Sequence, residues 1–218
     1  MSQKCILCES QTKVIQHRKS NVDYHYCKEC EFISKDNNAI ISLEEEFKIY
    51  NYHINSIEDT RYVDYFYEFL NDAVFKYVNR GKKGLDFGSG PSPVLAQILE
   101  RYHGYNMDIY DIFYSPQKVY LKNKYDLVTC TEVIEHLKNP LEYFKLFKEL
   151  LIEDGVLSIM TQFHHNDDAH FLNWHYIRDE SHISFYTPKT MKYIAEQTGL
   201  KIIYTNGIKY TTFAIDSQ

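Results

Sequence analysis

The chain of 218 residues is poor in glycine, proline and tryptophan, with 8, 5 and 1 of each, and it has no long apolar run. A membrane-spanning helix needs about 20 consecutive apolar residues, so we predict no such span. The first residues lack the apolar core of a signal peptide, and we therefore expect a cytoplasmic protein. No segment repeats, and no low-complexity tract occurs.

Positive charge is also scarce. The chain has 24 Lys and Arg against 30 Asp and Glu, which gives a net charge of −6. This balance argues against a protein that binds nucleic acid through bulk charge. With 44% hydrophobic and 25% charged residues, the composition is typical of a soluble globular domain with an appendage.

Cysteine is rare except in the first thirty residues, which contain four of the five. They form two Cys-x-x-Cys pairs with eighteen residues between them: Cys5, Cys8, Cys27 and Cys30. Such spacing is typical of a structural four-thiolate zinc site, and we predict a zinc ribbon over residues 1–36. Two disulfides or a redox pair are the alternatives, which a cytosolic context disfavours.

A polar linker and a lead-in helix are expected over residues 37–80. The helical pattern begins at Asp59. Before it, residues 50–55 combine aromatic and polar side chains. They form either a linker helix with a solvated acidic face or a lid whose Tyr52 and His53 reach a bound ligand.

A glycine turn follows an apolar run in Leu85-Asp86-Phe87-Gly88-Ser89-Gly90-Pro91-Ser92-Pro93 and precedes a helical pattern over 94–103. This strand, turn and helix predict a nucleotide-binding α/β domain over residues 81–218. Proline occupies the position of the third glycine of the dinucleotide fingerprint, which disfavours a pyrophosphate at the helix start. The loop therefore suits a nucleoside without a diphosphate.

A candidate ribose ligand ends the second strand of this domain. Asp111 follows Gly90 by 21 residues, and a carboxylate at this point can accept hydrogen bonds from both ribose hydroxyls. Asp108 is the rival, although it falls within the strand. Only fourteen residues separate Asp111 from Asp126, too few for a helix and a strand, and residues 119–121 are a candidate edge strand.

Acidic and histidine residues follow the next buried strand, Leu127–Cys130. The run Thr131-Glu132-Val133-Ile134-Glu135-His136-Leu137 falls at the carboxyl end of this strand, where open α/β sheets bind ligands. Further on, residues 201–215 are typical of a hairpin with a two-residue turn at Asn206-Gly207.

Together, residues 85–93, Asp111 and residues 131–137 resemble the class I S-adenosylmethionine-dependent methyltransferases. The likeness is strongest to small bacterial members whose fourth strand ends in Glu-Val-x-Glu-His, some of which carry an N-terminal zinc ribbon. The resemblance implies a Rossmann-like, seven-stranded, mostly parallel sheet with a C-terminal antiparallel hairpin, and S-adenosylmethionine as cofactor. The cofactor-binding residues that it implies are Asp86, Gly88, Ser89, Gly90, Asp111, Glu132 and Val133.

The acceptor side of the site is expected in residues 161–186, which follow a strand end and are dense in ionisable groups. His182 is the leading candidate for a catalytic base because imidazole titrates near neutrality. The other catalytic candidates are His175, Tyr186 and His136. The substrate-binding candidates are Trp174, Tyr176, Tyr52, His53 and Arg178, whose guanidinium suits an anionic group. The alternatives for this stretch are a polar surface loop or a second metal site from His164, Asp167, Asp168 or His170.

The sequence thus predicts a methyltransferase that acts on a small molecule, with a structural Zn²⁺ and no membrane partner. An RNA base methyltransferase that grips RNA through the ribbon is an alternative, which the negative charge disfavours. A dehydrogenase, and a cofactor-binding module without catalysis, are the others. The acceptor atom and the oligomeric state stay open.

Overall fold

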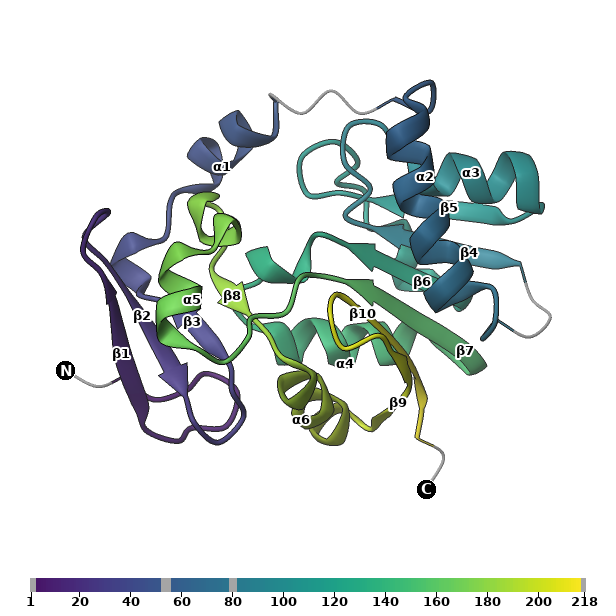
Figure 1. Ribbon diagram of the computed structural model, residues 1–218. Helices are drawn as coiled ribbons and strands as arrows, with labels where there is room; N and C mark the ends of the chain where they lie inside the picture. Colours follow the sequence, from purple (N-terminus) through teal and green to yellow (C-terminus); the bar gives the residue numbers. More distant parts are fainter. Residues whose placement is uncertain (1–2, 52–55, 79–81, 217–218) are drawn as a thin grey trace.

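Two sheets form the molecule, as the computed structural model shows for residues 3–51, 56–78 and 82–216 (Figure 1). The larger has the strand order β5-β4-β6-β7-β10-β9, and the smaller has the order β1-β2-β3-β8. Among the described residues, no helix is both long and apolar enough to cross a membrane.

The larger sheet is parallel in its first four strands and antiparallel in its last two. Its strands are β4 (Lys83–Phe87), β5 (Asn106–Tyr110), β6 (Tyr125–Thr131), β7 (Leu151–Met160), β9 (Leu200–Thr205) and β10 (Tyr210–Ile215). The predicted Rossmann-like α/β fold with its terminal hairpin is confirmed. The hairpin turn is longer than predicted, because Asn206 Oδ1 accepts hydrogen bonds from the backbone amides of 208, 209 and 210.

The described residues form six strands in this sheet rather than the predicted seven. Residues 119–121 were a candidate edge strand, and they lie instead in a short 3-10 helix, η3 (Val119–Lys122). Tyr120 anchors this helix, since its side chain is buried and its ring lies 5.1 Å from that of Tyr110. This segment is thus held to the sheet by the packing of Tyr120, and not by the backbone hydrogen bonds of an edge strand.

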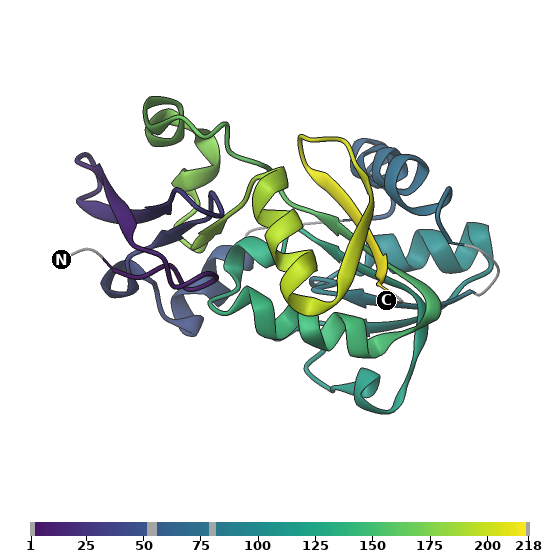
Figure 2. The ribbon, with the colours of Figure 1, turned by 90° about the horizontal axis from the view of Figure 1, so that it is seen from below.

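Helices cover both faces of the larger sheet, as Figures 1 and 2 show from two directions. On one face lie α2 (Thr60–Phe69), its π-helical continuation η2 (Leu70–Val74) and α3 (Val94–His103). On the other lie α4 (Pro140–Leu150) and α6 (Pro188–Thr198). Each face has its own apolar core, with Phe69 and Leu99 fully buried in one and Phe144 and Phe213 in the other.

The smaller sheet combines the N-terminal segment with a strand from far along the chain. Its strands are β1 (Thr12–His17), β2 (Val22–Cys27), β3 (Ile33–Lys35) and β8 (Ser184–Phe185). Ile33 pairs with Phe185 in antiparallel register. The short helices α5 (Asp168–Asn173) and η5 (His175–Arg178) pack on this sheet, with the rings of Phe171 and Tyr24 5.1 Å apart. The predicted domain boundary at residue 36 stays a prediction, but residues 184–185 extend the ribbon sheet.

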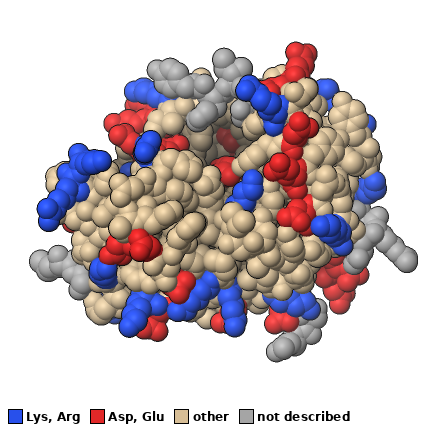
Figure 3. All heavy atoms as spheres, viewed as in Figure 1, with Lys and Arg blue, Asp and Glu red and all other residues tan. Residues whose placement is uncertain are grey.

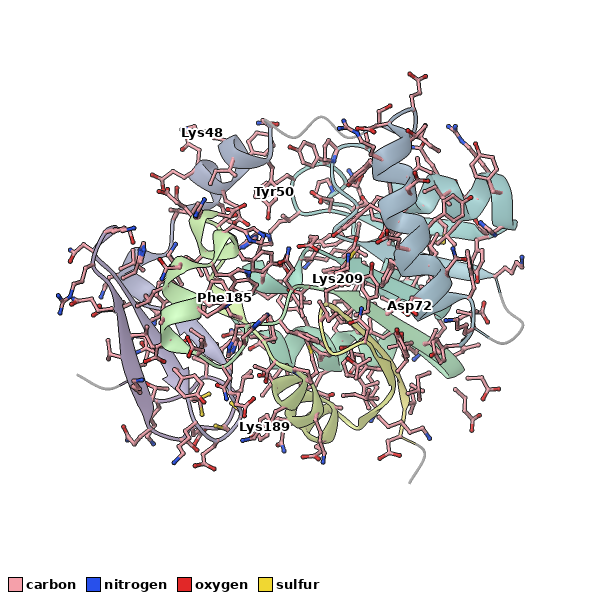
Figure 4. The ribbon with its side chains drawn as sticks, viewed as in Figure 1. Lys48, Tyr50, Asp72, Phe185, Lys189 and Lys209 are labelled. Atoms are coloured by element: carbon pink, nitrogen blue, oxygen red, sulfur yellow. The ribbon has the colours of Figure 1, made fainter. Side chains whose placement is uncertain are left out.

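The linker contains a short helix, α1 (Leu43–Tyr50), preceded by the 3-10 turn η1 (Asn37–Ala39). A capping box starts α1, in which Ser42 and Glu45 each accept from the other's backbone amide. The predicted lid residues Tyr52 and His53 lie outside the described residues. Figure 4 shows the Tyr50 side chain directed from α1 toward the larger sheet.

Candidate functional site

A pocket of about 720 Å³ opens at the carboxyl ends of β4, β5 and β6, and we call it the central pocket. Its walls come from the ends of these strands and from α1 and α2. Its residues include Glu46, Tyr50, Tyr62, Tyr65, Asp86, Gly88, Gly90, Asp111, Glu132, Val133, His136, Asp179 and His182. Figure 3 shows the surface hollowed between α1 and α2, with acidic side chains inside the hollow.

The glycine turn after β4 forms one wall, and both glycines have positive φ. Gly88 has φ +83°, and a Cβ there would lie 2.1 Å from Cγ2 of Val133. Gly90 has φ +67°, and a Cβ there would meet nothing within 4 Å. The first glycine is therefore required by close packing, and the second leaves the loop backbone open to a ligand.

Asp111 lines the pocket just after β5, as predicted. Its Oδ2 accepts from the amide of Gly90 at 3.0 Å, and its Oδ1 accepts from the amides of Phe113 and Tyr114 at 2.9 and 3.0 Å. Asp108 is outside the pocket lining and accepts from the Tyr125 hydroxyl at 2.6 Å. The positions thus favour Asp111 over Asp108 as the ribose ligand, because Asp111 lines the pocket, is held in place by three amides, and keeps a lone pair on Oδ2 for a ribose hydroxyl.

Asp86 lies at the base of the same wall. Its carboxyl is buried and accepts from the Thr129 hydroxyl at 2.9 Å. Burial raises the pKa of Asp86 to about 7, and the nearby Asp111 charge adds to the rise. A cationic ligand group beside Asp86 would reverse this shift.

Two carboxylates share hydrogen-bond donors beside the pocket. The Tyr176 hydroxyl lies 3.0 Å from Glu132 Oε2 and 2.6 Å from Glu135 Oε1. Tyr65 donates to Glu132 and Thr161 donates to Glu135. The two acids thus share the single hydroxyl proton of Tyr176. Burial, together with the charge of Glu132, raises the pKa of Glu135 well above its usual range. The pair needs a proton or a cation.

Two histidines, His136 and His182, line the central pocket with their ring centroids 4.8 Å apart. His136 Nδ1 lies 3.1 Å from the Ser181 carbonyl and His182 Nδ1 lies 2.7 Å from the Tyr176 carbonyl. A carbonyl only accepts, so each Nδ1 carries the proton and each Nε2 keeps its lone pair. Burial lowers the pKa of His136 to about 3 and also lowers that of His182. Both imidazoles are therefore neutral at pH 7.

A candidate metal centre results, because the ligand atoms of Glu135, His136 and His182 all lie within 4.8 Å of one another. Backbone carbonyls fix the tautomers of the two histidines, which is the support that metal-bound histidines receive in proteins. We call these three residues the Glu-His cluster.

Several sequence-predicted residues lie elsewhere. Tyr186 is fully buried and donates to the Ile134 carbonyl at 2.7 Å, so its position is structural rather than catalytic. His175 is exposed and outside the pocket lining. Trp174 and Arg178 line a different cavity. The alternative metal set of His164, Asp167, Asp168 and His170 forms no candidate metal group among the described residues.

No role was predicted for Glu135, Tyr65, Glu46 or Asp179. Glu135 lies in the run 131–137 at the carboxyl end of β6, and its adjacency to His136 was the available signal. Tyr65 lies on α2, which was predicted only as a lead-in helix. The helical spacing from Tyr62 to Tyr65 does not reveal that the second hydroxyl reaches Glu132, 67 residues away.

The N-terminal cysteines form a second cluster, the thiol cluster. Cys5 and Cys30 have their sulfurs 3.6 Å apart, and those of Cys8 and Cys27 are 3.3 Å apart. All four lie within 4.8 Å of one another, and all five cysteines of the chain are free thiols. A tetrahedral zinc with sulfur at about 2.3 Å would hold sulfurs about 3.8 Å apart, close to these spacings.

The two turns of the thiol cluster also match each other in backbone geometry. Cys5 donates to the Ser10 carbonyl at 2.8 Å, and Cys27 donates to the Phe32 carbonyl at 2.9 Å. Each turn ends in a glutamate of positive φ, Glu9 and Glu31. This repeated turn directs two sulfurs from each pair toward one centre.

The larger sheet, with a glycine turn and an acid at adjacent strand ends, defines the class of Rossmann-like α/β domains. The family described as "Methyltransferase domain" matches residues 60–205, well over half of the chain. The protein therefore belongs to the methyltransferase-domain family.

Comparisons with single proteins agree with this family. A stretch of 38 residues is 50% identical to a ubiquinone biosynthesis O-methyltransferase of Glaesserella parasuis serovar 5 (strain SH0165), which covers 17% of this chain and 16% of that protein. An O-methyltransferase from neocarzinostatin biosynthesis, solved with S-adenosyl-L-homocysteine and 1,4-dihydroxy-2-naphthoic acid, has a TM-score of 0.52. It is 10% identical, and the match covers 80% of this chain and 62% of that one.

An O-methyltransferase family protein from Burkholderia thailandensis has a TM-score of 0.50 and 13% identity, over 73% of this chain and 61% of that one. The chain thus spans less than two thirds of the length of these three relatives. At such identities the structural matches show the fold.

Proposed function

We propose that the protein transfers a methyl group from S-adenosylmethionine to a hydroxyl oxygen of a small molecule. The observation that carries the proposal is the central pocket, in which a glycine turn and Asp111 lie across from a carboxylate and imidazole cluster. The structural relatives named above as O-methyltransferases support the choice of oxygen as the acceptor atom.

The cofactor would lie along the glycine turn. Asp111 accepts the ribose hydroxyls, and Asp86 pairs with the ammonium of the methionine end. Glu132 and Val133 flank the adenosine. Ser89 lies between the two glycines and lines the same wall. The chain supplies mainly orientation here, since methyl transfer requires the acceptor oxygen in line with the methyl carbon and sulfur.

The acceptor would bind on the opposite side, near His136 and His182. Their neutral Nε2 atoms can accept a hydrogen bond from its hydroxyl and so orient it, while their lowered pKa values make them weak bases. The Glu-His cluster also fits a divalent cation, because it combines a buried carboxylate, a second acid at Glu132 and two neutral imidazoles. Such a cation would act as a Lewis acid that lowers the pKa of the acceptor hydroxyl.

A structural zinc in the thiol cluster forms the second part of the proposal. The four sulfurs leave no ligand position for a substrate, so the role would be to stabilise the ribbon. Thr190 on α6 donates to the Cys30 carbonyl at 2.8 Å. The zinc turn would thereby be connected to the helix layer of the larger sheet.

Calorimetric titration with S-adenosylhomocysteine tests the cofactor assignment, with Asp111→Asn against Asp108→Asn. We expect Asp111→Asn to weaken binding about tenfold, which is about 1.4 kcal/mol, because one charged acceptor for the ribose is lost. Asp108→Asn is the matched control and should bind like the wild type, since Asp108 contacts Tyr125 rather than the pocket. Failure of the wild type to bind would refute the proposal, and equal weakening in both variants would refute the role of Asp111.

A further inference from the structure

A second cavity, of about 530 Å³, lies between the smaller sheet and the segment 172–180, and we call it the ribbon cavity. None of its lining residues also lines the central pocket. The turn between β1 and β2, the connection from β3 to α1, and η5 form its walls. Figures 1 and 2 both show α5, which leads into η5, beside the β1–β2 hairpin.

Cations dominate the ribbon cavity although the whole chain is acidic. Lys19, Lys35 and Arg178 line it, and Glu180 is the one acidic residue in the described lining. A volume of this size is typical of small-molecule sites. An excess of cations around such a volume favours an anionic ligand.

Lys35 is the buried cation of this cavity, with only 6% of the residue exposed. Its Nζ donates to the Glu180 carbonyl at 2.7 Å, and no carboxylate of the described residues lies within ion-pair distance. Burial lowers the pKa of Lys35, and the charges of Glu180 and Asp179 offset part of that effect from farther away. An ammonium that is buried with a carbonyl as its partner still lacks a full countercharge.

The rest of the wall is apolar. Trp174, Tyr24 and Ile177 line the cavity, and Tyr24 and Ile177 are buried. A ligand with an anionic end for Lys35 and a flat apolar body for Trp174 would satisfy both kinds of wall. We propose that the ribbon cavity binds an organic anion, an aryl carboxylate or aryl phosphate, with its anionic group on Lys35 and Arg178.

Binding there would be transmitted to the central pocket through one short segment. Lys35 bonds to the carbonyl of Glu180, two residues before His182. Ile177 and Arg178 line the ribbon cavity, while the preceding Tyr176 bonds to Glu132 and Glu135 and holds His182 through its carbonyl. The site itself does not depend on the proposed methyl transfer, because its ligand contacts are all outside the central pocket.

Trp174 makes the test direct, since it is the one tryptophan of the chain and it lines the cavity. We would titrate the full chain with phenyl phosphate, benzoate, inorganic phosphate and neutral benzyl alcohol at constant ionic strength, and record tryptophan fluorescence. An aromatic anion should give a saturable change that persists with S-adenosylhomocysteine at saturation. Lys35→Met should weaken binding about tenfold or more.

Lys13→Met is the matched control, since Lys13 lies on β1, pairs with Asp168 and does not line the cavity. It should bind like the wild type. Arg178→Gln, at an exposed position, provides a second variant if Lys35→Met fails to fold, and it should also weaken binding. Saturation by benzoate or by phenyl phosphate decides which anion the site takes, and either supports the proposal, whereas inorganic phosphate that binds as well as phenyl phosphate would overturn the aryl part of it. Equal binding of benzyl alcohol, no saturable signal, or competition by S-adenosylhomocysteine would overturn it.

Discussion

The thiol cluster and the Glu-His cluster are both groups of potential metal ligands, yet they are built in opposite ways. Each half of the thiol cluster lies on a single tight turn, and the two turns repeat the same backbone hydrogen bond. The Glu-His cluster takes two adjacent residues from the short 3-10 helix η4 (Ile134–His136), which follows β6, and a third, His182, 46 positions later along the chain.

The surroundings of the two clusters differ as well. The sulfurs of the thiol cluster fill the positions around one point, which leaves no opening for a substrate. The Glu-His cluster borders a pocket of about 720 Å³ through His136 and His182. A closed set of ligands can thus be built from residues that are close in sequence, and it suits a structural metal. An open set beside a pocket depends on contacts between distant residues, and it suits catalysis.

Removal of one thiol should produce the largest effect. We expect Cys27→Ser to lose most of the bound zinc and to unfold the ribbon, because a structural zinc in a small fold contributes about 10 kcal/mol or more. Zinc content by atomic emission and protease sensitivity of residues 1–36 measure this. Cys130→Ser is the control: Cys130 is buried in β6, far from the cluster in sequence, and should retain zinc. Full zinc retention by Cys27→Ser would contradict the four-thiolate assignment.

A substitution at Glu135 tests the Glu-His cluster. Glu135→Gln keeps the shape of the side chain and one of its two hydrogen-bond acceptors but removes the carboxylate as a cation ligand, and we expect kcat to fall roughly a hundredfold. Affinity for S-adenosylhomocysteine and zinc content should stay unchanged. In the wild type, mild chelation should abolish turnover and added Mg²⁺ or Mn²⁺ should restore it, with zinc still bound. Turnover that is insensitive to both treatments would leave the cluster without a cation.

The same contrast explains what the sequence predicts well. The cysteine spacing, the glycine turn and Asp111 each depend on a short local pattern. The structure brings the four cysteines together and places the glycine turn and Asp111 at the central pocket, while their roles stay predictions. Helix α3 and the caps of α6 at Thr187 and Gly199 also follow from local signals. These features need no knowledge of distant contacts.

The rest depends on contacts that no local pattern encodes. Tyr65 reaches Glu132 across 67 positions, and Tyr176 joins two acids that lie more than forty positions earlier. Trp174 and Tyr176 are two residues apart and were predicted to share the substrate site. Their rings pack on each other with centroids 4.8 Å apart, but Trp174 lines the ribbon cavity while the buried Tyr176 directs its hydroxyl to the two acids.

The buried Asp86 should make the affinity of the central pocket for its cofactor depend on pH. Its folded-state pKa of about 7 lies above the ordinary value of 3.8. Its contribution to stability is therefore present below about pH 4 and is lost as the pH rises through 7. The cationic methionine end of the cofactor should favour the ionised form, so affinity for S-adenosylhomocysteine should rise about tenfold from pH 6 to pH 8.

Calorimetry at several pH values measures this dependence, and Asp86→Asn should remove it. An unchanged pH profile in Asp86→Asn would assign the dependence to another group. Any titration of the ligand's own amine is the same for the wild type and for Asp86→Asn, so the difference between their two profiles reports the acid.

The smallest effect on catalysis is expected at Tyr186. This residue contacts the backbone of the segment after β6, whereas Tyr176 contacts the acidic side chains of the same segment. Tyr186 and Tyr176 are both buried tyrosines ten positions apart, but Tyr186 donates to the Ile134 carbonyl and Tyr176 donates to the two acids. Tyr186→Phe removes one of the two hydrogen bonds that the Ile134 carbonyl accepts, and the bond from the Leu137 amide at 3.1 Å remains. The variant should lower the free energy of unfolding by about 0.5–1.5 kcal/mol.

At a temperature where Tyr186→Phe remains folded, its kcat and its affinity for S-adenosylhomocysteine should match the wild type. Tyr176→Phe, which removes the one proton shared by Glu132 and Glu135, should lower kcat at similar stability. Denaturant unfolding and steady-state kinetics on the two variants separate these effects. A fall in kcat without loss of stability in Tyr186→Phe would mean that the path of the backbone at Ile134, and not the charge of the cluster alone, governs the reaction.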